Sequence, residues 1–129
     1  MKTFTTPLTA DEAIEKLLSG VEAEGMRVVA HINGQANAAK IGQTVPADQI
    51  LEIFRPDFAI KVWKACKAAG HDIPLRIHVY EEQGITKVTC RMPSESFAPF
   101  ESDELMQVAK ELDAIFSNIL GFVTEAEDE

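Results

Sequence analysis

The sequence IPLRIHVYEEQGITKVTCRM, residues 73–92, predicts a β-hairpin, and the rest of the fold can be worked out from it. Apolar and polar side chains alternate on both sides of residues 83–84 (Gln-Gly), and a glycine-containing pair between two such runs is typical of a two-residue turn. That turn places Val79 opposite Val88, so the apolar side chains share one face. A three-residue turn would place Val79 opposite Lys87. We therefore predict the two-residue register.

The other face of this hairpin carries polar side chains, which the same register also pairs. The pairs are Tyr80 with Lys87, His78 with Thr89, and Arg76 with Arg91. Like charges directly opposite each other destabilise a sheet, so the arginine pair requires a counter-charge. That charge can come from Glu52 on a neighbouring strand, from Asp57, from a carboxylate of a second subunit, or from a bound anion.

The segments around the hairpin alternate between strand and helix patterns. Strands are predicted at residues 2–6, 26–32 and about 49–54, and helices after Thr9, after Asn33, at 57–69 and after Ser102. Thr9 and Glu12 have the spacing of a capping box. The last helix carries one continuous apolar stripe, from Leu105 to Ile119. These elements predict an α+β domain, in which an antiparallel sheet of about five strands is backed on one face by two long helices.

Local patterns give more detailed expectations for three segments. Uninterrupted alternation along 26–32 would place Val28 and Ile32 on one face and His31 on the other. Helical spacing places Trp63 on the apolar side of the helix at 57–69. Residues 94–100, with Pro99 and two phenylalanines, are expected to form a loop.

Composition and charge limit the classes of protein to which the sequence can belong. The 129 residues are 46% hydrophobic and 26% charged, values typical of one globular domain, which we assign to residues 1–124. Residues 125–129 form an acidic C-terminal tail. The net charge of −9 disfavours nucleic acid and anionic membranes as partners, and no apolar run reaches the ~18 residues that span a bilayer. Two cysteines, Cys66 and Cys90, suit a reducing cytosol, so we expect a cytoplasmic protein.

The middle of the chain, from Arg55 to Arg91, is locally cationic within this acidic protein. We predict a ligand-binding surface made of Arg55, Arg76, His78, Tyr80 and Arg91. Such a surface suits a small anion or an acidic partner. No metal-ligand spacing, nucleophile motif or glycine-rich phosphate loop occurs, so we predict no metal, no cofactor and no catalytic residue.

Three stretches resemble a known family. They are residues 51–57 (LEIFRPD), 73–81 (IPLRIHVYE) and 91–94 (RMPS), which are similar to the prokaryotic family called domain of unknown function 302. The resemblance implies a TBP-like fold with a curved antiparallel sheet, and homodimerisation, but no activity. The chain departs from many relatives at Asn33-Gly34, where they have Asp-His, and at 54–56 (Phe-Arg-Pro), where they have Gly-Asn-Pro.

Three functions compete on this basis. The first is a non-catalytic homodimeric module that binds a small anionic ligand or an acidic partner. The second is an enzyme that uses His78 or His31 as acid or base on a small anionic metabolite. The third is a purely structural or interaction dimer, in which the polar sheet face is all subunit interface.

Overall fold

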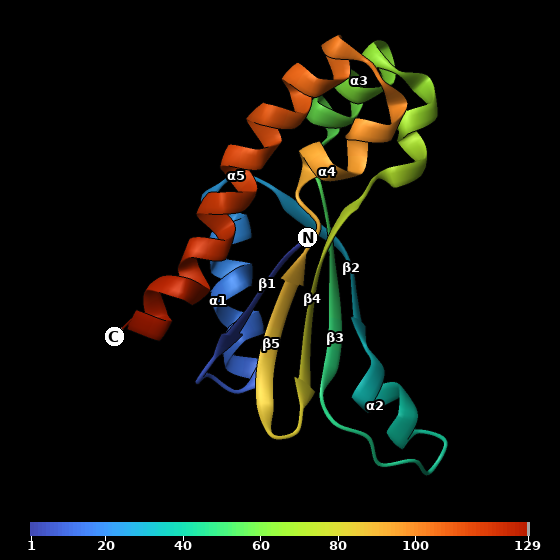
Figure 1. Ribbon diagram of the computed structural model, residues 1–129. Helices are drawn as coiled ribbons and strands as arrows, with labels where there is room; N and C mark the ends of the chain where they lie inside the picture. The colour runs from blue at the N-terminus through green and yellow to red at the C-terminus, as the bar shows by residue number, and fades with distance from the viewer. Residues whose placement is uncertain (129) are drawn as a thin grey trace.

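Five antiparallel strands form a single sheet in the computed structural model of the protein, with the order β1-β5-β4-β3-β2 (Figure 1). The strands are β1 (Lys2–Thr6), β2 (Arg27–Asn33), β3 (Asp48–Phe54), β4 (Leu75–Glu82) and β5 (Ile85–Cys90). The helices are α1 (Ala10–Ala23), α2 (Gly34–Ala39), α3 (Pro56–Ala65), α4 (Pro93–Phe97) and α5 (Asp103–Asp128), with 3-10 turns η1 (Lys67–Asp72) and η2 (Ala98–Phe100). The structure describes the backbone of residues 1–128 and the side chains of residues 1–124. The side chains of the predicted acidic tail, 125–129, lie outside the described residues.

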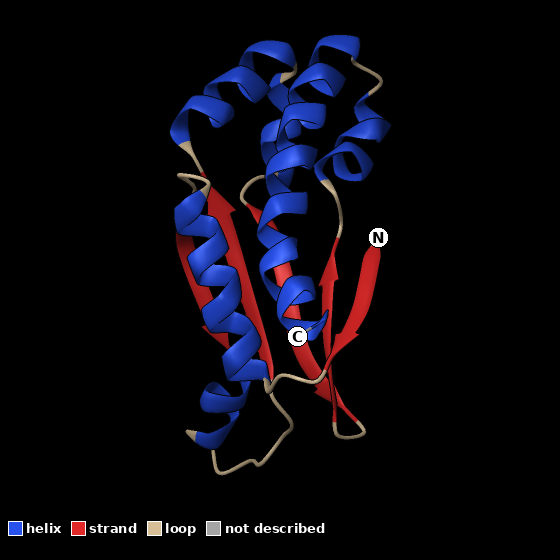
Figure 2. Ribbon diagram, turned by 90° about the vertical axis from the view of Figure 1, so that its left-hand side faces the viewer, coloured by secondary structure: helices blue, strands red, loops and turns tan. Residues whose placement is uncertain are grey.

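The two long helices α1 and α5 lie side by side on one face of the sheet, as predicted (Figure 2). Their caps form as the sequence indicates: Thr9 and Glu12 make the capping box of α1, and Ser102 Oγ accepts the Leu105 amide at 3.1 Å. The core lies between these helices and the alternate strand residues that face them. Its fully buried members include Leu17, Leu51, Ile77, Val79, Val88, Leu112 and Phe116. The opposite face of the sheet is left open to solvent over much of its area. No helix of the described residues is long and apolar enough to cross a membrane.

The hairpin has the predicted register, with Val79 paired to Val88 and His78 to Thr89. Gln83 and Gly84 both have positive φ, 53° and 77°, as the mirror-image turn of a two-residue hairpin requires. One predicted pair is wrong, because β5 ends at Cys90 and Arg91 is therefore not in the ladder. The chain leaves the sheet here because Pro93, which lacks an amide hydrogen, begins α4.

A β-bulge in β2 overturns the predicted faces of that strand. Val28 pairs with Ile53 and Ala30 with Glu52, so Val29 is an extra residue without a partner. Because one extra residue reverses the alternation that follows, Val28 is on the core face while Ala30 and Ile32 are on the open face.

Two other local expectations also need correction. The helix predicted at 57–69 ends at Ala65, because Cys66 adopts an extended conformation, and a 3-10 turn follows. Trp63 is 43% exposed, with its indole against Gly70, where a Cβ would lie 2.9 Å from Nε1. The predicted loop at 94–100 contains α4 and η2, since Pro93 at the first helical position and the Glu95 carboxylate on the Met92 amide stabilise a short helix.

Candidate functional site

The open face of the sheet contains a cavity of about 480 Å³ where β4 begins and β5 ends, beside α4. It is lined by residues 71–76, which run from η1 into β4, and by His78, Thr89, Arg91, Ser96 and Met1. The sequence brings these segments together because the hairpin register aligns the start of β4 with the end of β5. Three of the five predicted site residues, Arg76, His78 and Arg91, therefore line one cavity.

Arg76 is the first cation of this cavity. It pairs with Glu52 in the β3–β4 register, and its Nη2 lies 4.0 Å from Glu52 Oε1. The side chain of Arg76 is 63% exposed, whereas that of Glu52 is only 21% exposed. Glu52 thus supplies the counter-charge expected from the sequence, at the outer limit of an ion pair, and among the described residues it pairs with no cation other than Arg76.

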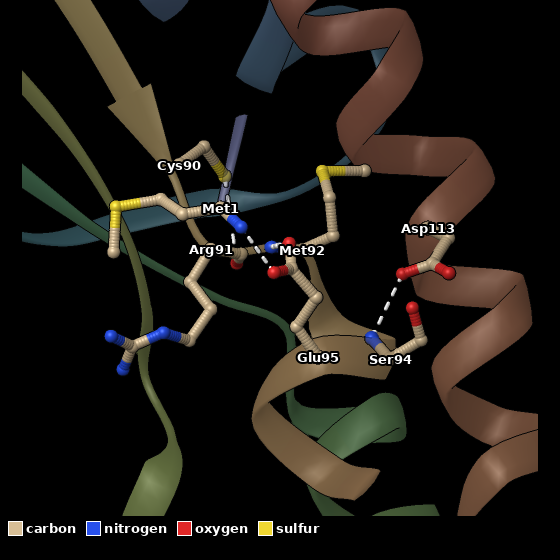
Figure 3. Close-up of polar contacts among 7 residues, drawn as sticks. All are labelled: Met1, Cys90, Arg91, Met92, Ser94, Glu95 and Asp113. Carbon is tan, nitrogen blue, oxygen red and sulfur yellow. Dashed lines mark hydrogen bonds and ion pairs between the residues drawn. The ribbon is translucent and has the colours of Figure 1, made fainter. Parts of the chain in front are cut away.

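Arg91 is the second cation, and its guanidinium forms no ion pair with any described residue. The nearby carboxylate of Glu95 is engaged elsewhere, by the N-terminal ammonium and by the Met92 amide. These two hydrogen bonds, in that order, lower the pKa of Glu95 from 4.5, and the positive charge of Arg91 adds a smaller contribution. Figure 3 shows the Arg91 side chain pointing away from Glu95.

Thr89 has a feature that no sequence pattern indicates. Its neighbours Val88 and Cys90 are buried in the core, so Thr89 faces the opposite side, where it lines the cavity beside His78. The Thr89 hydroxyl oxygen is buried and has no hydrogen-bond partner among the described residues. Buried hydroxyl groups are ordinarily hydrogen-bonded, so this one is an exception among the described residues.

His78 is held from two sides. Its Nε2 lies 2.8 Å from Asp48 Oδ1, and its ring stacks on Tyr80 with centroids 4.6 Å apart. Tyr80 itself does not line the cavity but supports the ring that does. No carboxylate partner for this histidine was predicted from the sequence, because Asp48 is placed diagonally from His78 by the pairing of β3 with β4, and α3 and η1 separate these strands in the chain.

The fifth predicted residue, Arg55, lies outside the cavity. It precedes α3, where it donates to Asp57 at 2.7 Å and to the Glu24 carbonyl at 3.0 Å, and its guanidinium lies over Phe58 at 4.4 Å. The hydrogen bond from Arg55 lowers the pKa of Asp57 from 3.8. Arg55 therefore joins the end of α1 to the start of α3, and it does not belong to the cavity that Arg76, His78 and Arg91 line.

His31 and Cys90, two other titratable groups, have structural surroundings and lie outside the cavity. His31 lies on the helix-covered side of the sheet, 2.7 Å from Gln49, which in turn donates to Asp11 at 2.8 Å. Burial raises the pKa of the Cys90 thiol to about 12, so at neutral pH it is protonated and a poor nucleophile. Within residues 1–124 no group of three or more His, Cys, Asp or Glu side chains could hold a metal ion.

Comparison with known proteins identifies a family but no activity. The family model described as "Domain of unknown function DUF302" matches residues 2–122. A crystal structure described as an uncharacterized conserved protein DUF302 from Bacillus stearothermophilus is similar, with a TM-score of 0.84, 22% sequence identity, and coverage of 95% of this chain and 96% of that chain. At this identity the similarity concerns the fold alone. No curated protein matches the chain.

Proposed function

The chain belongs to the DUF302 family, as the motifs in residues 51–57, 73–81 and 91–94 predicted. We propose that it is a non-catalytic, cytosolic, homodimeric module that binds a small organic anion in the cavity beside Arg76 and Arg91. The observation that carries the proposal is the guanidinium of Arg91. It lines the cavity without an ion pair among the described residues, and like-charged Arg76 lines the same cavity. An anion between these two groups relieves their repulsion and makes charge-assisted hydrogen bonds to both.

The size of the cavity favours a small molecule over an acidic protein surface. Its volume of about 480 Å³ falls in the range of roughly 300–1,000 Å³ typical of small-molecule sites. The net charge of −9 also repels an acidic macromolecule over long range, whereas a small anion interacts mainly with the local cations.

Thermal unfolding with a panel of organic anions tests this function. Arg91→Gln should abolish the stabilisation by any anion that protects the wild type. Arg27→Gln is the matched control, because it removes an exposed arginine from β2, outside the cavity. Equal protection of wild type and Arg91→Gln would place the anion elsewhere, and no protection by any anion would contradict the function.

The contact between Asp48 and His78 favours a second function, acid–base catalysis on the bound anion. A carboxylate on one ring nitrogen orients a histidine for proton transfer at the other nitrogen, which is an arrangement that general acid–base catalysis uses. The two functions differ in outcome: a binding module returns the anion unchanged, whereas an enzyme converts it. Proton NMR of the anion mixed with wild type, and with His78→Gln, distinguishes them.

The uncovered sheet face supports the homodimer part of the proposal. It exposes Ile32 on β2, and outside the cavity it carries Asp48 on β3 and Lys87 on β5, which is paired with Glu82 of β4 at 2.8 Å. A twofold axis through this part of the face places Ile32 of each copy in the interface, since a twofold interface uses the same surface on both subunits. In the purely structural alternative the same interface covers the cavity, and no anion binds.

A further inference from the structure

We propose that the ligand of the cavity is an amino acid, whose carboxylate binds at Arg91 and whose ammonium group binds at Asp72. This inference rests on the anion-binding function proposed above, because the carboxylate of the amino acid is the anionic group. It names the class of ligand and adds Asp72 to the residues that bind it.

Asp72 is a carboxylate that lines the cavity and has no charged partner in the part of the chain that the structure describes. It forms no ion pair there, with Arg91 or with any other cation. The residue is half-buried, so its charge has lost part of its contact with water. A charge in such a position is stabilised by a partner of opposite sign, which a ligand ammonium group supplies.

Arg91 is the matching unpaired cation of the same cavity. Asp72 ends η1, shortly before β4 begins at Leu75, and Arg91 follows β5 directly. Because β4 and β5 are antiparallel neighbours, these two ends lie at the same edge of the sheet. Asp72 and Arg91 therefore line one cavity without pairing with each other, so both charges are available to a ligand.

The other charges at this end of the sheet are already balanced. Arg76 lines the cavity but has Glu52 as its partner, with 4.0 Å between Nη2 and Oε1. The N-terminal ammonium of Met1 is paired with Glu95. With these pairs set aside, one positive and one negative charge remain, and a zwitterion satisfies both. A ligand with a carboxylate alone would satisfy only the cation and would be repelled by the remaining carboxylate.

Two histidines, His71 and His78, also line the cavity and could add positive charge. Asp48 contacts His78 but lies outside the cavity and is exposed to solvent. Histidine side chains are ordinarily neutral at pH 8, whereas the ammonium group of an amino acid is still protonated. Measurements at pH 8 therefore test Asp72 and Arg91 with little contribution from the histidines.

The lining next to Asp72 favours an amino acid with an apolar side chain. Ile73 and Pro74 follow Asp72 in the chain, and both are half-buried residues of the lining. The cavity volume of about 480 Å³ falls in the range of roughly 300–1,000 Å³ typical of small-molecule sites, which leaves room for a side chain beside the two charged groups. Leucine and phenylalanine are therefore suitable probes.

The test measures affinities by titration calorimetry at pH 8. Each amino acid is compared with the acid that has the same skeleton but no amine: L-leucine with 4-methylpentanoate, and L-phenylalanine with 3-phenylpropanoate. The protein is wild type, Asp72→Asn or Arg91→Gln. Asp103→Asn is the matched control, because it removes an exposed carboxylate from the start of α5, outside the cavity.

We expect wild type to bind at least one of the two amino acids about ten-fold more tightly than its amine-free counterpart. Asp72→Asn should weaken binding of that amino acid about ten-fold, whereas the amine-free acid should bind equally or more tightly, because a repelling charge is gone. Arg91→Gln should weaken both ligands, and Asp103→Asn should weaken neither. Melting curves without ligand show whether each variant folds, and the comparison of ligands on wild type tests the class of ligand even where a variant does not.

The outcomes separate this inference from the function on which it rests. Equal or tighter binding of the amine-free acids to wild type overturns the amino-acid ligand and leaves anion binding intact. Amino-acid binding that survives Asp72→Asn overturns the role of Asp72. If neither amino acid binds, while another organic anion protects wild type but not Arg91→Gln from thermal unfolding, the inference is wrong and the function stands. If no anion and no amino acid binds, both are wrong.

Discussion

Asp48 Oδ1 lies 2.8 Å from His78 Nε2, although 30 residues separate the two in the chain. The contact is diagonal across β3 and β4, because the register pairs Asp48 with Tyr80 and His78 with Ile50. Tyr80 stacks on the ring that Asp48 holds. One acidic residue and one aromatic residue thus fix the orientation of the histidine at the edge of the cavity.

The exposure of this pair predicts a small contribution to stability. The side chains are 52% and 34% exposed, so solvent screens their interaction. In a double-mutant cycle of Asp48→Asn and His78→Gln, we expect a coupling energy of about 0.2–1 kcal/mol at a pH where His78 is protonated. Urea unfolding of the four proteins measures it. A coupling above about 2 kcal/mol would mean that the pair is far less screened than its exposure indicates.

The capping box of α1 predicts a pH dependence of stability. Glu12 accepts the Thr9 amide at 2.9 Å, and hydrogen bonds from the Thr9 backbone and then its side chain lower the pKa of Glu12 from 4.5. Because the folded-state pKa is depressed, this stabilisation is present above pH ~4.5 and is lost as the pH falls through the lowered pKa.

Glu12→Ala should therefore reduce the melting temperature at pH 7 by more than it does at pH 3. Glu15→Ala is the control, because Glu15 is an exposed glutamate of the same helix that lies outside the capping box. The same loss for Glu12→Ala at both pH values would show that the carboxylate form of Glu12 adds nothing to the cap.

The homodimer proposal predicts that one substitution on the open sheet face separates the subunits. Ile32 is 42% exposed there, and an aspartate in its place buries an unpaired charge in the interface. Sedimentation equilibrium at micromolar concentration should give a dimer for wild type and a monomer for Ile32→Asp. Ile41→Asp is the control, because Ile41 follows α2 and is 78% exposed. A monomeric wild type, or a dimer that tolerates Ile32→Asp, contradicts this interface.

Local chemistry explains which parts of the structure were predictable from sequence. The hairpin register follows from residues within one turn, and the caps at Thr9 and Ser102 depend on contacts three residues apart. The bulge at Val29 has no such signal, because no glycine or proline interrupts that strand. Uninterrupted alternation of the side chains between the two faces was therefore expected.

The candidate site was partly predictable for the same reason. Arg76, His78 and Arg91 came together because they belong to the hairpin and the residue that follows it. Asp48 was missed because its position depends on pairing between β3 and β4, which are separated in sequence by α3 and η1. The unpaired state of the Thr89 hydroxyl depends on the placement of every atom around it, and no sequence pattern carries that information.

The last prediction concerns the different surroundings of the two arginines. The sequence left open a carboxylate that bridges both, and a bridge buried in the sheet would make Arg76→Ala cost ~3–5 kcal/mol by leaving a charge unpaired. In the structure Glu52 forms an ion pair with Arg76, at 4.0 Å, and with no other cation of the described residues, and the Arg76 side chain is 63% exposed. We therefore expect Arg76→Gln to lower the free energy of unfolding by less than about 1 kcal/mol.

Arg91→Gln should leave the unliganded protein unchanged or slightly more stable, because Arg91 has no ion pair among the described residues and shares the cavity with Arg76. Urea unfolding of both variants at 50 mM and 500 mM salt measures the difference. High salt should reduce the effect of Arg76→Gln, since it screens the exposed pair with Glu52. A loss of more than about 2 kcal/mol for Arg91→Gln would show that Arg91 stabilises the fold, and its guanidinium would then not be free to bind an anion.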